Sequence, residues 1–91
     1  MSKDYIKAKE LYKLALIENP NDPLALNNLA ELFEIQNKYD SSLYFFNLSI
    51  KHDSINPYTY NNRGELFEII GGKDAALEDF NKAIELDSLF S

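Results

Sequence analysis

Two clusters of asparagine and glutamate are the side chains in this 91-residue sequence best placed for recognition chemistry. A carboxamide both donates and accepts hydrogen bonds, so an asparagine pair can clamp the backbone of an extended peptide. A row of carboxylates favours a partner that carries lysine or arginine. Two plainer alternatives stay open: asparagines that satisfy local helix-end groups, and glutamates on a solvated helix face. The clusters are Asn27, Asn28, Glu31 and Glu34, then Asn61, Asn62, Glu65 and Glu68.

Catalytic and metal chemistry find little support in the sequence. There is no cysteine and one histidine, which excludes thiolate and multi-histidine metal sites. His52 has no serine or cysteine partner at a spacing that suits nucleophilic catalysis. The glutamates lie at a regular helical spacing and not in a loop that wraps a cation. We therefore expect no metal, no cofactor and no enzymatic activity.

Charge and hydropathy narrow the classes of partner. The net charge of −6 counts against nucleic acid, which requires a basic surface. No apolar run approaches the roughly 18 residues of a membrane span, and the first residues lack the pattern of a secretion signal. We expect a cytoplasmic protein that binds neither nucleic acid nor a membrane.

A repeat of 34 residues organises the chain, because residues 23–56 and 57–90 align without a gap. Each copy contains one of the two asparagine-glutamate clusters, and the apolar positions that follow the cluster also match between the copies. The residues before position 23 fit the second half of the same unit. We therefore expect a single domain over residues 1–91, composed of a half-repeat (1–22) and two repeats (23–56 and 57–90).

Each repeat predicts two helices, because its apolar residues recur at steps of three and four. Asn37 and Gly71 fall at the breaks, and both residue types tolerate the left-handed conformation that ends a helix. Pro23 and Pro57 suit a first helical turn, and the Asp or Asn before each proline can cap it. The sequence predicts five helices, near residues 4–18, 23–36, 39–53, 57–70 and 73–88.

These positions resemble the tetratricopeptide repeat, whose pattern is a large residue, Leu-Gly, an aromatic, a small residue ahead of Phe, and Pro. Arg63 stands where the family prefers leucine, so we expect it to be exposed or to extend its charged end to solvent. Serine replaces the turn proline in both copies. The matching residues are Leu26, Leu29-Ala30, Phe33, Ser42, Phe46 and Ser54, then Tyr60, Arg63-Gly64, Phe67, Ala76, Phe80 and Ser88.

The resemblance implies an all-α fold, a right-handed α-α superhelix or solenoid of about five antiparallel helices. In this family the first helix of each pair lines a concave wall on which peptides dock, and Asn28 and Asn62 match the peptide-clamping position. We therefore expect a non-catalytic interaction module whose acidic groove takes a peptide or helix with basic residues. The expected groove residues are Leu24, Asn27, Asn28, Glu31, Glu34 and Ile35, then Tyr58, Asn61, Asn62, Glu65, Glu68 and Ile69.

The last predicted helix carries apolar residues that no following helix would cover. Either the chain is an excerpt of a longer repeat array, or two copies cover each other as a homodimer. The second case gives an alternative function, a structural or oligomerisation element that assembles through the uncovered C-terminal helix. The residues expected on this face are Leu77, Ile84, Leu86 and Phe90.

Overall fold

The computed structural model describes residues 3–90, with the side chains of residues 4–88. Five helices and no strand occur in this range, which confirms the expected all-α helical-repeat solenoid, and no helix end lies more than two residues from its predicted position. The helices are α1 (Lys3–Glu18), α2 (Pro23–Ile35), α3 (Tyr39–His52), α4 (Pro57–Ile70) and α5 (Lys73–Phe90).

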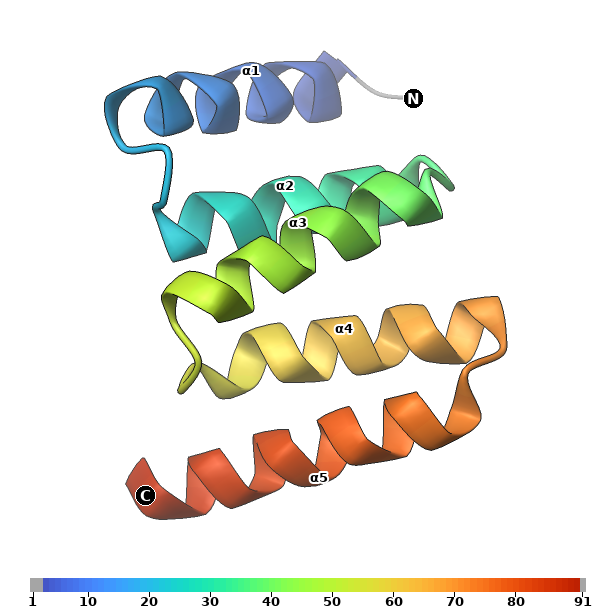
Figure 1. Cartoon of the computed structure of the whole chain (residues 1–91). Coiled ribbons are helices and arrows are strands. Elements are labelled where there is room, and N and C mark those ends of the chain that lie inside the picture. Colours follow the sequence, from blue (N-terminus) through green and yellow to red (C-terminus); the bar gives the residue numbers. More distant parts are fainter. Residues whose placement is uncertain (1–2, 91) are drawn as a thin grey trace.

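The helices stack in chain order, with α1 and α5 at opposite ends (Figure 1). Helix α2 packs closely on α3, and α4 packs closely on α5, so each repeat forms an antiparallel hairpin. Helix α1 contacts α2 as α3 contacts α4, and α2 also touches α4. The first helices of the two repeats therefore lie near each other, which positions their polar residues on a common surface.

Both repeats begin with the same side-chain cap. The carboxylate of Asp22 accepts a hydrogen bond from the backbone N–H of Leu24 at 3.1 Å, and the side-chain oxygen of Asn56 accepts one from the backbone N–H of Tyr58 at 2.9 Å. Each cap satisfies an amide that the first helical turn leaves without a backbone partner. The capping roles predicted for these two positions are confirmed.

The turns inside the two hairpins also share one geometry. Asn37 and Gly71 have φ angles of 62° and 91°, the left-handed conformation predicted for the helix ends. The next residue in each turn donates its backbone N–H to the carbonyl of an equivalent phenylalanine, Phe33 at 2.8 Å and Phe67 at 2.7 Å. These bonds close a Schellman-type end in both repeats and fix the reversal of the chain.

Small residues allow the helices of each hairpin to approach closely. Ala30 and Phe46 are fully buried together with Leu66 of the next repeat. A side chain on Gly64 would place its Cβ only 2.8 Å from a ring carbon of Phe80. Since nothing larger than hydrogen fits there without a shift of the ring, glycine permits the contact between α4 and α5.

The hairpin α2–α3 is also joined by side-chain hydroxyls. Ser42 donates its Oγ–H to the carbonyl oxygen of Ala30, and Ser49 donates to that of Pro23, both at 2.7 Å. Both serines are buried, so the bonds satisfy groups that water cannot reach. Together the two bonds tie α3 to α2 at two points along the hairpin.

Arg63 differs from the sequence-based expectation, because it is half-buried and its charged end is bonded to neighbouring side chains. Its Nε and Nη2 donate to the two carboxylate oxygens of Asp79 at 2.8 and 2.7 Å. Its Nη1 donates to the side-chain oxygen of Asn47 at 2.9 Å, and the guanidinium lies within 5.7 Å of the Tyr60 and Phe67 ring centroids. Arg63 therefore joins α3, α4 and α5 through a bidentate ion pair and aromatic contacts.

The pairing predicts that removing the carboxylate of Asp79 destabilises the fold. Asp79→Ala leaves the guanidinium without its partner, so we expect the free energy of unfolding to fall by about 2–4 kcal/mol. The double variant Arg63→Leu with Asp79→Leu should lose much less, because an apolar pair can replace a buried ion pair at little cost. Urea unfolding measures both, with Glu78→Ala as the exposed control on the same helix. A loss for Asp79→Ala no larger than that of the control would contradict the prediction.

The hydroxyl of Thr59 predicts a stabilising substitution. Thr59 is fully buried, and its Oγ1 has no hydrogen-bond partner among the described residues. Since an unpaired buried hydroxyl is costly, Thr59→Val should raise the free energy of unfolding by about 1 kcal/mol. Thr59→Ser keeps the hydroxyl and loses a methyl group, so it should show no gain in the same thermal or urea experiment. Equal stability of the Val and Ser variants would refute this reasoning.

Candidate functional site

A depression of about 200 Å³ lies between the first helices of the two repeats. We call it the acidic groove and define it by its lining residues. Helix α2 contributes two glutamates and an isoleucine, and α4 contributes an asparagine and a glutamate. The structure therefore brings together carboxylates that stand more than 30 positions apart in the sequence. The lining residues are Glu31, Glu34, Ile35, Asn62 and Glu65.

Asn62 connects the two walls of the acidic groove. Its Nδ2 donates to a carboxylate oxygen of Glu31 at 2.6 Å and to the side-chain oxygen of Asn27 at 3.2 Å. Asn27 is only 5% exposed, so it belongs to the packing of α2 against α4 and not to a surface that a peptide can reach. On α4, Asn61 donates to Glu65 at 3.4 Å, a contact within one helix.

The remaining residues of the expected groove lie outside the depression. Asn28 is half-buried, and Glu68 is exposed. Leu24 and Tyr58 are exposed near the starts of α2 and α4, and Ile69 is exposed near the end of α4. These apolar residues lie along the same two helices as the carboxylates and extend the accessible surface beyond the acidic groove.

Burial and mutual repulsion shape the charge of the acidic groove. Partial burial raises the pKa of the Glu31 carboxyl, and the charge of Glu65 adds to this, whereas the hydrogen bond from Asn62 opposes it. Burial also raises the pKa of Glu34, with further contributions from Glu65 and Glu31. Among the side chains of residues 4–88, the one ion pair is Arg63–Asp79. No lysine or arginine in this range therefore forms an ion pair with the carboxylates of the acidic groove. A cation placed between them would relieve their repulsion.

The geometry of the carboxylates does not favour a metal ion. Over the part of the chain that the structure describes, no three histidine or carboxylate side chains are grouped closely enough to hold one. None of the helices in that part is both long and apolar enough to span a bilayer.

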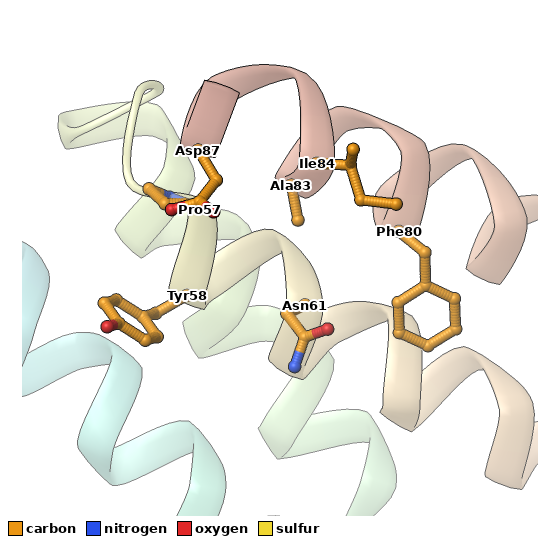
Figure 2. Close-up of a pocket in the computed structure, with 7 residues that line it drawn as sticks. All are labelled: Pro57, Tyr58, Asn61, Phe80, Ala83, Ile84 and Asp87. Atoms are coloured by element: carbon orange, nitrogen blue, oxygen red, sulfur yellow. The ribbon is translucent and has the colours of Figure 1, made fainter. Parts of the chain in front are cut away.

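A second, larger hollow of about 560 Å³ lies between α4 and α5 (Figure 2). The sequence pattern placed Tyr58 and Asn61 in a groove and Ile84 on a self-association face, but it indicated no binding role for the other lining residues. The repeat could have indicated these residues, since each lining position has a counterpart 34 residues earlier in the chain. The lining residues are Pro57, Tyr58, Asn61, Phe80, Ala83, Ile84 and Asp87.

The uncovered face of α5 is narrower than the sequence predicted. Leu77 and Ile84 are 60% and 65% exposed, as expected for this face. Leu86 is only 4% exposed, so its assignment to the uncovered face was wrong. It follows Asp79 by two helical turns and therefore lies on the side of α5 that packs on α4. The side chain of Phe90 lies outside the described residues.

Comparisons with known proteins support the repeat assignment. Two models of the tetratricopeptide repeat match the chain, over residues 11–44 and 57–88. The second match lies within the repeat 57–90, whereas the first is out of phase with 23–56 and runs from α1 through α2 into α3.

One solved structure, described as "MamA MSR-1 C2", aligns with 97% of this chain at a TM-score of 0.84 and 20% sequence identity. This likeness concerns the fold, and the chain spans about half (51%) of that chain's length. A search of curated proteins found no match.

The raised pKa values of Glu31 and Glu34 predict how stability depends on pH. A carboxyl with a raised pKa binds more protons in the folded state, so stability falls as the pH rises through its titration. Glu34→Gln removes one such group, and we expect the variant to gain stability relative to the wild type as the pH rises above about 4.5, the ordinary pKa of a glutamate. The gain should be a few tenths of a kcal/mol, because solvent screens this half-exposed site.

Urea unfolding at several pH values tests this, with Glu68→Gln, an exposed neighbour on α4, as the control. A wild-type stability that rises relative to Glu34→Gln as the pH increases would contradict the assignment.

Proposed function

Since the chain belongs to the tetratricopeptide repeat family, whose repeats generally mediate protein–protein interaction, we propose that it is a non-catalytic binding module. The acidic groove binds a peptide or helix of a partner protein that carries lysine or arginine. The observation that carries this proposal is the meeting of Glu31 and Glu34 from α2 with Glu65 from α4 in one depression without a basic neighbour.

A basic side chain gains from this arrangement in two ways. Glu31 and Glu34 are already partly removed from water, and the charge of Glu65 repels both, so a cation between them lowers an existing electrostatic cost. Ile35 lies at the same depression and offers apolar surface to the aliphatic stem of lysine or arginine. Arginine can also pair with a carboxylate in bidentate geometry, as Arg63 does with Asp79.

The asparagines have separate parts in this proposal. Asn28 is half-buried and engages the peptide backbone with its carboxamide. Asn62 already donates to two side chains of α2, so its carbonyl oxygen is the group that accepts a peptide N–H. Asn27 is buried and serves the packing of α2 against α4. These roles supply contacts to the peptide backbone, while the carboxylates supply the preference for basic side chains.

Removing the carboxylates of the acidic groove tests the proposal directly. The triple variant Glu31→Gln, Glu34→Gln and Glu65→Gln keeps the size of each side chain and removes three negative charges. We expect the affinity for lysine- and arginine-containing peptides to fall by about tenfold or more, and wild-type binding to weaken with added salt. Peptide titrations, monitored by calorimetry or by shifts of the backbone amide resonances, measure these affinities. An acidic peptide of equal length serves for comparison.

A matched control separates a local site from general attraction to an acidic protein. The variant Glu10→Gln, Glu18→Gln and Glu78→Gln removes the same charge from exposed positions outside the acidic groove. Its affinity should stay close to that of the wild type. Equal loss in both triple variants, or wild-type protein that binds none of the basic peptides, would overturn the proposal.

A further inference from the structure

The carboxylates of the acidic groove differ in how firmly they are held. Glu31 and Glu34 are half-buried on α2, whereas Glu65 is exposed on α4. Glu31 accepts a hydrogen bond from Nδ2 of Asn62 at 2.6 Å, and Glu65 accepts a longer one from Asn61 at 3.4 Å. Glu31 is therefore both half-buried and closely bonded, so its carboxylate has a restricted orientation.

Asn62 is itself fixed by the packing of the two repeats. Its Nδ2 also donates to the side-chain oxygen of Asn27 at 3.2 Å, and Asn27 is only 5% exposed. One amide group of α4 thus bonds two side chains of α2. The orientation of Glu31 therefore depends on a residue of the opposite wall, and that residue is anchored at the contact between the repeats.

The bond from Asn62 leaves acceptor capacity on Glu31. An ionised carboxylate accepts through two oxygens, each with two lone pairs, and Asn62 donates to one of these oxygens. Both oxygens can still accept from a planar group with two parallel N–H donors. A guanidinium has such a fork, whereas an ammonium donates from a single nitrogen.

Arg63 shows what a guanidinium can do between the helices of this fold. It donates two bonds to the carboxylate of Asp79 at 2.8 and 2.7 Å and a third to the side-chain oxygen of Asn47 at 2.9 Å. These acceptors belong to α5 and α3, so one guanidinium bonds two helices at once. The carboxylates of the acidic groove likewise stand on two helices, α2 and α4.

The partial burial of the α2 wall adds a second basis for discrimination. A cation that pairs with Glu31 or Glu34 gives up part of its water. A guanidinium is more weakly hydrated than an ammonium, so it loses less on entering the acidic groove. Ile35, which is 50% exposed at the same depression, covers the apolar stem of the side chain that enters.

We propose that the acidic groove selects arginine over lysine, and that Asn62 is the positioning residue for this selection. The arginine forms a fork with the carboxylate of Glu31 and directs its remaining N–H donors toward Glu34 and Glu65. A lysine binds the same carboxylates by charge alone and more weakly. The selection rests on the proposed function, because it requires that the acidic groove binds basic peptides.

Three short peptides of glycine, serine and alanine test the selection. They are identical except for one central residue, which is arginine, lysine or citrulline, the uncharged analogue of arginine. Since one more charge-assisted hydrogen bond separates them, the arginine peptide should bind about tenfold more tightly than the lysine peptide. The citrulline peptide should bind most weakly. Shifts of the amide resonances of Glu31, Glu34 and Glu65 report these affinities.

Asn62→Ala tests the positioning role, because it removes the bond to Glu31 and keeps all three carboxylates. Both affinities should fall, since the peptide backbone also loses a contact, but the ratio of arginine to lysine affinity should approach one. Asn28→Ala, at the other backbone contact, is the matched control and should lower both affinities at an unchanged ratio. Urea unfolding checks that both variants fold. An unchanged ratio in Asn62→Ala would assign Asn62 a merely structural role and overturn the proposal.

A second pair of variants tests the fork without changing Asn62. Glu31→Gln keeps the size of the side chain and removes the carboxylate that Asn62 orients, so the preference for arginine should be lost. Glu34→Gln removes an equal charge from the same wall and should retain most of the preference. Equal ratios in these two variants would overturn the assignment to Glu31.

The selection and the proposed function can fail separately. Equal affinity of the wild type for the arginine and lysine peptides would overturn the selection and leave the binding of basic peptides in place. Equal affinity for the arginine and citrulline peptides would show that charge has no part and would overturn both. Absence of binding by any of the peptides would also overturn both.

Discussion

The enclosure of Phe46 is the contact on which the rest of the structure depends. Its ring is fully buried with Ala30 of its own hairpin and Leu66 of the next repeat. No hairpin of this size can bury its apolar face alone, so each one requires a neighbour. Because one side chain is shared by α2, α3 and α4, the same contact that forms a hairpin also sets the position of the following one. The acidic groove, which lies between α2 and α4, is a consequence of that stacking.

The two repeats reach the same geometry with different chemistry. In the first, Ser42 and Ser49 bond α3 to α2, while alanines take the equivalent positions in the second. In the second, Arg63 and Asp79 replace an apolar pair and join α4 to α5. Equivalent positions in the two repeats therefore keep the paired helices at a similar distance, although the interaction between the helices differs. An apolar contact, a hydroxyl bond and an ion pair are alternatives for one structural task.

Local features of the fold could be predicted from the sequence, whereas contacts between helices could not. The caps and the left-handed turn at Asn37 depend on residues that are adjacent in the chain, so the sequence alone was sufficient to predict them. Arg63 and Asp79 stand sixteen positions apart, and only the angle between α4 and α5 places them together. The burial of Leu86 likewise follows from which side of α5 packs on α4. For the candidate site, the repeat indicated the glutamates that meet, but not the bond from Asn62 that removes Asn27 from the surface.

The bonds of Asn62 have a mechanical consequence. The two repeats are joined by polar bonds beside the acidic groove and by dense apolar packing around Leu66. The bond from Asn62 to Glu31 lies at the acidic groove, where water can replace it, while apolar packing resists separation. Bending of one repeat relative to the other should therefore occur as a hinge motion about the apolar contacts of Leu66. Such a joint would let the acidic groove widen or narrow while both hairpins stay folded.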